Sequence, residues 1–84
     1  MYSYTLSMEA DTKVFKNTCA LIEKMKNVQK NGSLLEDVDG SLIQKYTVSG
    51  KKIKVFSDCL VDAVYVDSDM DLDHVFPKET KVDM

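Results

Sequence analysis

Hydrophobic and polar residues alternate along the first part of the chain. Over residues 2–8 every second side chain is apolar, and serine or threonine stands between them. This period of two predicts a half-buried β-strand. The apolar positions are Tyr2, Tyr4, Leu6 and Met8. We expect these four side chains to lie in the core.

The spacing of apolar residues then lengthens to a helical period. Between Val14 and Val28 they recur every three or four positions, which predicts an amphipathic helix. Asp11 or Thr12 can cap its start, and Asn31-Gly32 favours the left-handed conformation that ends a helix. Lysines dominate the opposite face, which we expect to be solvated.

After this helix the period of two returns, interrupted by turn residues. Alternation over residues 34–38, 42–48, 53–56 and 60–66 predicts four further strands. The turn dipeptides between them are Asp39-Gly40, Ser49-Gly50 and Ser57-Asp58. The expected fold is α+β: a two-layer sandwich of order β-α-β-β-β-β, with one N-terminal helix packed on an antiparallel sheet of four to five strands. Residues 1–76 would form this single domain, and residues 77–84 a flexible C-terminal tail.

The predicted sheet is apolar on both faces. Ile43 and Phe56 fall opposite the face that carries Tyr46, Ile53 and Val55. One helix covers only one face of a sheet, so the second apolar face needs another cover. That cover could be the C-terminal tail, a second copy of the chain or a different protein, and we expect a partner.

Charge is divided unevenly along the chain. The 84 residues are 44% hydrophobic and 30% charged, as expected for one small globular domain, and the net charge is −3. Residues 1–56 carry nine lysines against six acidic residues, which gives +3, whereas residues 57–84 carry two lysines against eight acidic residues, which gives −6. All eleven basic residues are lysine, which argues against direct nucleic-acid binding because such recognition usually recruits arginine.

No segment of the sequence indicates a membrane or secreted protein. The longest nearly apolar run, residues 59–66, is too short to span a bilayer, and we find no secretory signal. The two cysteines, Cys19 and Cys59, are a poor disulfide framework. We therefore expect a cytoplasmic protein without a membrane partner, whose thiols are reduced and buried.

Six aspartates and no lysine lie between Asp58 and Asp73. The last four, Asp67, Asp69, Asp71 and Asp73, occupy every second position. In an extended strand they would share one face at a spacing of roughly 6.6 Å. The row could instead begin a helix capped by Ser68, protect a strand edge from unwanted pairing, or form a negative surface that docks on a basic partner.

Specific chemistry has little support in the sequence. A calcium loop is disfavoured, because Leu72 stands where an EF-hand requires glycine and Lys78 where it requires glutamate. His74 is the only histidine, and a surface or turn position is its ordinary interpretation. Two distant cysteines and one histidine lack the spacing of a zinc site. The lysines around Ser49-Gly50 are better explained by pairing with aspartates, for instance Lys54 with Asp62, than by a nucleic-acid footprint.

The expected function is binding without catalysis, cofactor or metal. We predict a small inhibitor-like protein, such as an immunity protein, an antitoxin, or a phage or mobile-element inhibitor of a host enzyme, whose acidic C-terminal surface meets a basic protein surface. The alternatives are a small-molecule- or metal-binding domain and a homodimeric structural module. The predicted partner-binding residues are Asp62, Asp67, Asp69, Asp71 and Asp73 for charge, with Phe56, Tyr65 and Met70 as apolar anchors.

Overall fold

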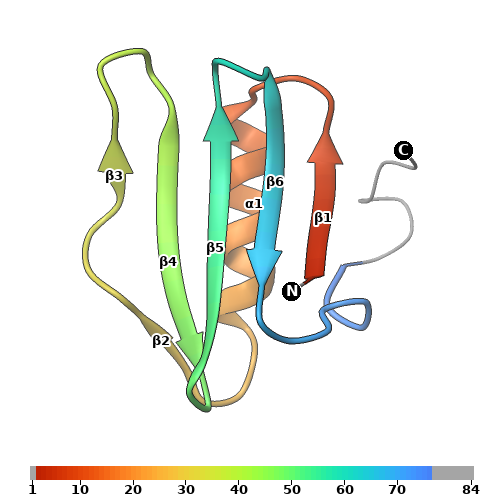
Figure 1. Ribbon diagram of the computed structural model, residues 1–84. Coiled ribbons are helices and arrows are strands. Elements are labelled where there is room, and N and C mark those ends of the chain that lie inside the picture. The colour runs from red at the N-terminus through yellow and green to blue at the C-terminus, as the bar shows by residue number, and fades with distance from the viewer. Residues whose placement is uncertain (1, 77–84) are drawn as a thin grey trace.

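An antiparallel sheet with one helix on one of its faces makes up residues 2–76, the part of the chain that the computed structural model describes (Figure 1). The elements are β1 Tyr2–Ser7, α1 Thr12–Glu23, β2 Val28–Lys30, β3 Leu35–Glu36, β4 Leu42–Val48, β5 Lys51–Asp58 and β6 Ala63–Ser68. The strands follow the order β1-β6-β5-β4-β2, and β3 also pairs with β4. The predicted α+β architecture is confirmed, and the sheet has six strands because β2 is added to the predicted order β-α-β-β-β-β. The tail predicted for residues 77–84 lies outside the described residues.

The predicted start of α1 is confirmed. Asp11 caps it, because its Oδ1 accepts hydrogen bonds from the amides of Lys13 at 2.8 Å and Val14 at 3.2 Å. Phe15 and Ile22 then point toward the sheet and are 2% and 0% exposed. The amphipathic face therefore packs as its spacing predicts.

The predicted end of α1 is wrong. The helix stops at Glu23 and does not continue to Asn31. Asn27 adopts a left-handed φ of 62° that reverses the chain. Val28 then pairs with Val48 of β4, as the first residue of β2. Val28 fits both the helical spacing and a strand, and in the structure it belongs to the strand that pairs with β4.

Two glycine-containing turns place β4 between its neighbours. Ser49 and Gly50 have φ values of 50° and 83°, the paired left-handed conformation of a two-residue hairpin turn, and they join β4 to β5. Gly40, with a φ of 89°, lies in the turn between β3 and β4, where the Asp37 amide donates to the Ser41 carbonyl at 2.8 Å. Both of these predicted turns are confirmed. The turn predicted at Ser57-Asp58 is wrong, because both residues lie within β5 and the chain turns after them.

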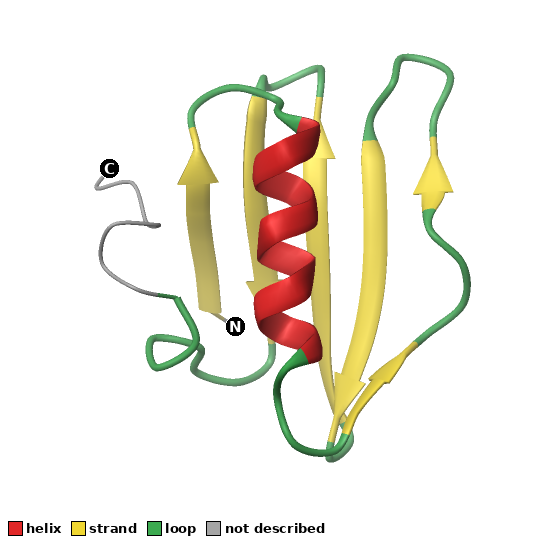
Figure 2. Cartoon of the chain, turned by 180° about the vertical axis from the view of Figure 1, so that it is seen from behind, coloured by secondary structure: helices red, strands yellow, loops and turns green. Residues whose placement is uncertain are grey.

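The core lies between α1 and the face of the sheet that the helix covers (Figure 2). Tyr46 of β4 and Ile53 of β5 point into it and are at most 1% exposed. Leu72 and Phe76, from the segment after β6, are buried in the same layer, and the Phe76 ring packs edge-on against Tyr4 with 5.5 Å between ring centroids. The chain after β6 therefore closes the helix side of the sheet, not the opposite side.

Several residues predicted for the core or for a strand are exposed. Tyr2, the first residue of the edge strand β1, is 46% exposed, and Met8, which follows that strand, is 58% exposed. Leu60 and Val61 are 87% and 64% exposed because they lie in the turn before β6. Asp62 ends that turn with a φ of 55°, so alternation over residues 60–62 does not produce a strand.

The sheet face opposite α1 has no covering layer within residues 2–76, and we call it the open face. A row of side chains crosses it in register, one from each of four strands. This apolar row consists of Leu35, Ile43, Phe56 and Tyr65. Ile43 and Phe56 thus lie opposite the buried face, as predicted.

Candidate functional site

The four alternating aspartates do not share a strand face. β6 ends at Ser68, so only Asp67 lies in the strand. β6 is also paired on both sides, with β5 and β1, and is not an edge. Ser68 begins no helix: its hydroxyl donates to the Met70 carbonyl at 2.7 Å and accepts from the Met70 amide at 3.0 Å. The strand-edge and helix-start interpretations are both wrong for this segment.

Asp67 and Asp69 lie beside lysines of the open face. Asp67 is opposite Lys54 in the β5–β6 register and accepts a hydrogen bond from the Ser3 hydroxyl at 2.9 Å. The Asp69 amide donates to the Lys52 carbonyl at 2.9 Å. These two carboxylates and two lysines line a hollow of about 190 Å³. The negative charge here is set against positive charge, so these residues form no purely acidic stripe.

Asp71 joins the segment after β6 to β1. The Tyr4 hydroxyl donates to Asp71 Oδ1 at 3.1 Å and accepts from the Leu72 amide at 2.7 Å. Asp71 Oδ1 also accepts from the Asp73 amide at 2.8 Å. Burial is the main cause that raises the pKa of the Tyr4 hydroxyl. Met70 is partly buried against the core. These contacts give Asp71 and Met70 structural roles on the helix side.

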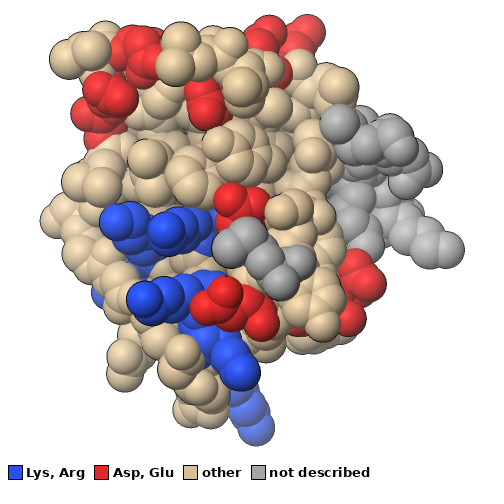
Figure 3. Space-filling model, in the orientation of Figure 1, with Lys and Arg blue, Asp and Glu red and all other residues tan. Residues whose placement is uncertain are grey.

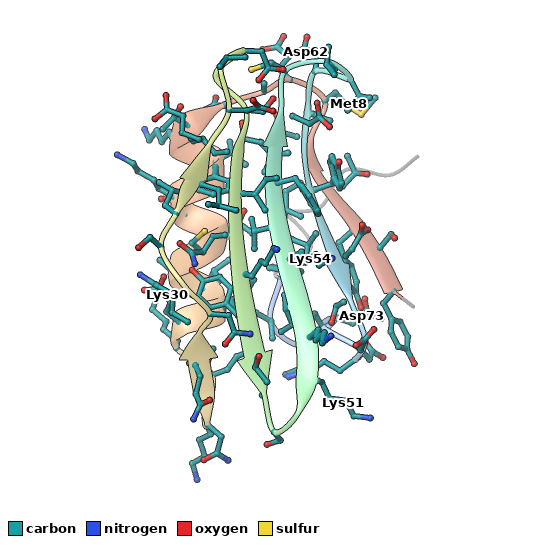
Figure 4. The ribbon with its side chains drawn as sticks, turned by 60° about the vertical axis from the view of Figure 1, so that its left-hand side comes forward. Met8, Lys30, Lys51, Lys54, Asp62 and Asp73 are labelled. Atoms are coloured by element: carbon teal, nitrogen blue, oxygen red, sulfur yellow. The ribbon has the colours of Figure 1, made fainter. Side chains whose placement is uncertain are left out.

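Asp62 lies at the opposite end of the sheet from Asp73 (Figure 4). Its Oδ1 accepts a hydrogen bond from the Ala10 amide at 2.8 Å, which links the turn before β6 to the loop after β1. The predicted pairing of Asp62 with Lys54 is wrong, since Lys54 lies opposite Asp67. The predicted acidic residues are therefore divided between the two ends of the sheet.

The predicted aromatic anchors lie together on the open face. The rings of Phe56 and Tyr65 stack across β5 and β6, with 4.7 Å between centroids and 16° between planes. The Tyr65 hydroxyl donates to Asp58 Oδ2 at 3.1 Å. Burial and then this hydrogen bond raise the pKa of Tyr65. Both rings are only half-buried, so they leave apolar surface at the centre of this face.

Three loops at one end of the sheet, together with the adjoining strand residues Glu36 and Asp58, form an acidic surface that we call the loop end, defined as residues 8–11, 36–41 and 58–62. They lie at the same end because successive strands run in opposite directions. The loop end contains no lysine and seven acidic residues: Glu9, Asp11, Glu36, Asp37, Asp39, Asp58 and Asp62. Figure 3 shows acidic side chains along the top of the open face and lysines below its middle.

Large apolar side chains are exposed on the same loops. They are Val38 at 103%, Leu60 at 87%, Val61 at 64% and Met8 at 58%. Hydrogen bonds connect the loops: besides the bond between Ala10 and Asp62, the Cys59 amide donates to the Ser41 hydroxyl at 2.9 Å. The acidic and apolar side chains therefore belong to one surface.

The sequence pattern missed this surface, because alternation assigned Val38 and Leu60 to strands. Five of the seven loop-end acids also precede Phe56, in the part of the chain with net positive charge. The available signal was the direction of the strands. In an antiparallel arrangement every second connection lies at the same end, so the acids of these three loops could have been grouped from the predicted element order.

The remaining titratable groups form no reactive cluster. Cys19 is buried and Cys59 exposed, so the prediction of two buried thiols is wrong for Cys59. The buried Tyr46 hydroxyl donates to Glu23 Oε2 at 2.6 Å, and burial raises the pKa values of both Tyr46 and Cys19. His74 is exposed. Within residues 2–76 no group of three or more His, Cys, Asp or Glu side chains is placed to hold a metal ion.

Three grooves beside α1 are the candidates for a small-molecule site. One, of about 420 Å³, is lined by Leu6 of β1, Val14 and other residues of the helix. A second, of about 510 Å³, lies between α1 and the segment after β6 and includes Met25, Met70 and His74. The linings of these two are largely aliphatic, whereas ligand sites use convergent polar groups to orient a molecule. The third, of about 240 Å³, has a more polar lining, in which the Tyr46 hydroxyl and the Glu23 carboxylate are hydrogen-bonded to each other.

No family model, curated protein or solved structure matches the chain. The described residues include no helix that is long and apolar enough to cross a membrane.

Proposed function

We propose that the protein is a small non-catalytic module that binds a basic surface of another protein through its loop end. One observation supports this most strongly: seven carboxylates and four exposed apolar side chains share the loop end, whose three loops are linked by hydrogen bonds. An excess of carboxylates on one surface steers a basic partner and rejects an acidic one. The apolar side chains supply the contact area that holds the complex.

The exposed apolar side chains of the loop end also support a role in binding. Val38 and Leu60 are almost fully accessible, and large apolar side chains gathered at one exposed site indicate a binding surface. Burying such a side chain completely stabilises a complex by about 1.5–3 kcal/mol. A partner with an apolar centre and a lysine- or arginine-rich rim would complement this arrangement.

Inhibition is the mode of action that we infer, by analogy with small binding proteins that cover an enzyme's functional surface. An immunity protein, an antitoxin or a phage-borne inhibitor of a host enzyme would act in this way. We place the interaction in the cytoplasm, where the exposed free thiol of Cys59 would stay reduced.

Affinity capture from an extract of the native host tests the proposal. The triple variant Asp37→Asn, Asp39→Asn and Asp62→Asn removes three charges but keeps an acceptor oxygen at each position, so the hydrogen bonds of the loops are retained. We expect its partner to elute at lower salt. The matched control, Asp67→Asn with Asp69→Asn, removes carboxylates from the other end and should bind as the wild type does.

A second variant tests the apolar contribution. Val38→Ser with Leu60→Ser should weaken capture without lowering the unfolding temperature, since both side chains are exposed. If the loop-end variants retain the partner as firmly as the wild type does, or if the control releases it equally, the loop end is not the binding surface.

A further inference from the structure

The open face carries a self-complementary pattern on β5. Lys54, Phe56 and Asp58 occupy alternate positions there, so opposite charges lie at equal distances on either side of an aromatic ring. A two-fold axis through Phe56, parallel to the sheet and perpendicular to β5, exchanges the two ends of that strand. It would place Lys54 of each copy over Asp58 of the other.

We propose that the open face pairs with the open face of a second copy around this axis, with the strands of the two sheets antiparallel. The apolar row forms the centre of the interface: Leu35 is 51% exposed, and Ile43, Phe56 and Tyr65 are half-buried. Facing sheets pack about 10 Å apart, a distance that side chains of this size fill. The second copy supplies the cover that this face lacks within residues 2–76.

Charge selects the orientation of the two copies. If the axis ran parallel to the strands, Lys54 would face Lys54 of the other copy, and Lys52 and Asp58 would likewise face their own counterparts. In the proposed orientation Lys54 faces Asp58 instead. Within residues 2–76 neither Lys52 nor Lys54 forms an ion pair, and the ion pair found there joins Lys30 to Glu23 at 3.6 Å.

The molecule is large enough for such an interface. Stable interfaces bury about 800 Å² on each partner. The chain extends 32 × 29 × 21 Å, so one face of its sheet can supply that area. A closed two-fold pair covers the open faces of both copies, so no apolar row is left to bind further copies.

Analytical ultracentrifugation of the full chain tests the pairing. We expect the wild type to form a concentration-dependent dimer. Lys54→Asp places a carboxylate over Asp58 at two symmetric positions and should raise the dissociation constant by about tenfold or more. Asp58→Lys should do the same. An equimolar mixture of the two variants should associate again, because each introduced charge then faces an opposite charge in the other chain.

Lys51→Asp is the matched control, since it makes the same charge change on the same strand, at a position that alternates with Ile53 and Val55 of the buried face. It should leave the dissociation constant within about twofold of the wild-type value. Asp58 also accepts hydrogen bonds from Leu60 and Tyr65, so circular dichroism must show that Asp58→Lys folds. If Asp58→Lys does not fold, the dissociation constants of Lys54→Asp and Lys51→Asp still test the pairing.

Three results would overturn the pairing. They are a wild-type chain that remains monomeric up to about 1 mM, equal effects of Lys54→Asp and Lys51→Asp, and folded variants that do not associate when mixed. The loop-end variants leave Lys54 and Phe56 unchanged and should still dimerise. Failure of the dimer is therefore distinguishable from failure of the proposed function.

Discussion

The Tyr4 hydroxyl is predicted to hold the segment after β6 against the core. It accepts a hydrogen bond from the Leu72 amide at 2.7 Å, and the Leu72 residue is 0% exposed. Tyr4→Phe keeps the ring that packs on Phe76 but removes this acceptor from a buried amide. A buried donor left unsatisfied costs about 1–3 kcal/mol. We therefore expect the free energy of unfolding to fall by about 1–3 kcal/mol.

Urea denaturation followed by circular dichroism measures this loss, and thermal unfolding should show it as a decrease of roughly 4–8 °C per kcal/mol. Tyr2→Phe is the matched control because the Tyr2 side chain is 46% exposed, and it should change the free energy of unfolding by less than about 0.5 kcal/mol. Asp71→Asn keeps an acceptor for Tyr4 and should cost less than Tyr4→Phe. Equal stabilities of Tyr4→Phe and Tyr2→Phe would refute the proposed role of the hydroxyl.

Three further predictions follow from local contacts. Burial and the hydrogen bond to Glu23 raise the pKa of the Tyr46 hydroxyl. The protonated hydroxyl therefore stabilises the fold fully below the ordinary tyrosine pKa of about 10, and this stability is lost as the pH rises above that value. Above that pH the urea midpoint of Tyr46→Phe should fall less steeply than the wild-type midpoint. Equal slopes would contradict this role of the Tyr46 hydroxyl. Asn27→Ala should cost about 1 kcal/mol because Asn27 is left-handed, whereas Asn27→Gly should not; equal urea midpoints would contradict this. A thiol reagent should modify Cys59 immediately and Cys19 only on unfolding, and rapid modification of both would show that Cys19 is accessible.

Local sequence signals predicted those elements whose structure is decided locally. Asp11 caps the helix with its own side chain, and Ser49-Gly50 forms a turn between adjacent strands. The end of α1 depends instead on a distant residue, because Val28 leaves the helix to pair with Val48. Alternation likewise continues past Ser68, but the strand stops there as the chain turns toward Tyr4. The ends of α1 and β6 thus depend on tertiary contacts between residues that are far apart in the sequence.

The candidate surfaces likewise differ in how far the sequence predicts them. Phe56 and Tyr65 could be predicted to share a face because strand alternation fixes their direction, and the structure stacks them. Charge counted along the chain was misleading, because Asp67 and Asp69 lie among lysines while Asp71 is bonded to Tyr4. The acidic surface that does exist is assembled from three connections. Its separation of charge runs along the strand direction of the folded molecule, not along the sequence.

This direction of charge separation relates the two proposed surfaces. The apolar row faces outward from the sheet, whereas Val38 and Leu60 lie on loops beyond the ends of the strands. In a face-to-face pair with antiparallel strands, the two loop ends would lie at opposite ends of the assembly. Each copy could then bind a basic partner while its open face stays covered. Such a dimer would be bivalent and would gain avidity only for targets whose two basic sites match the distance between its loop ends.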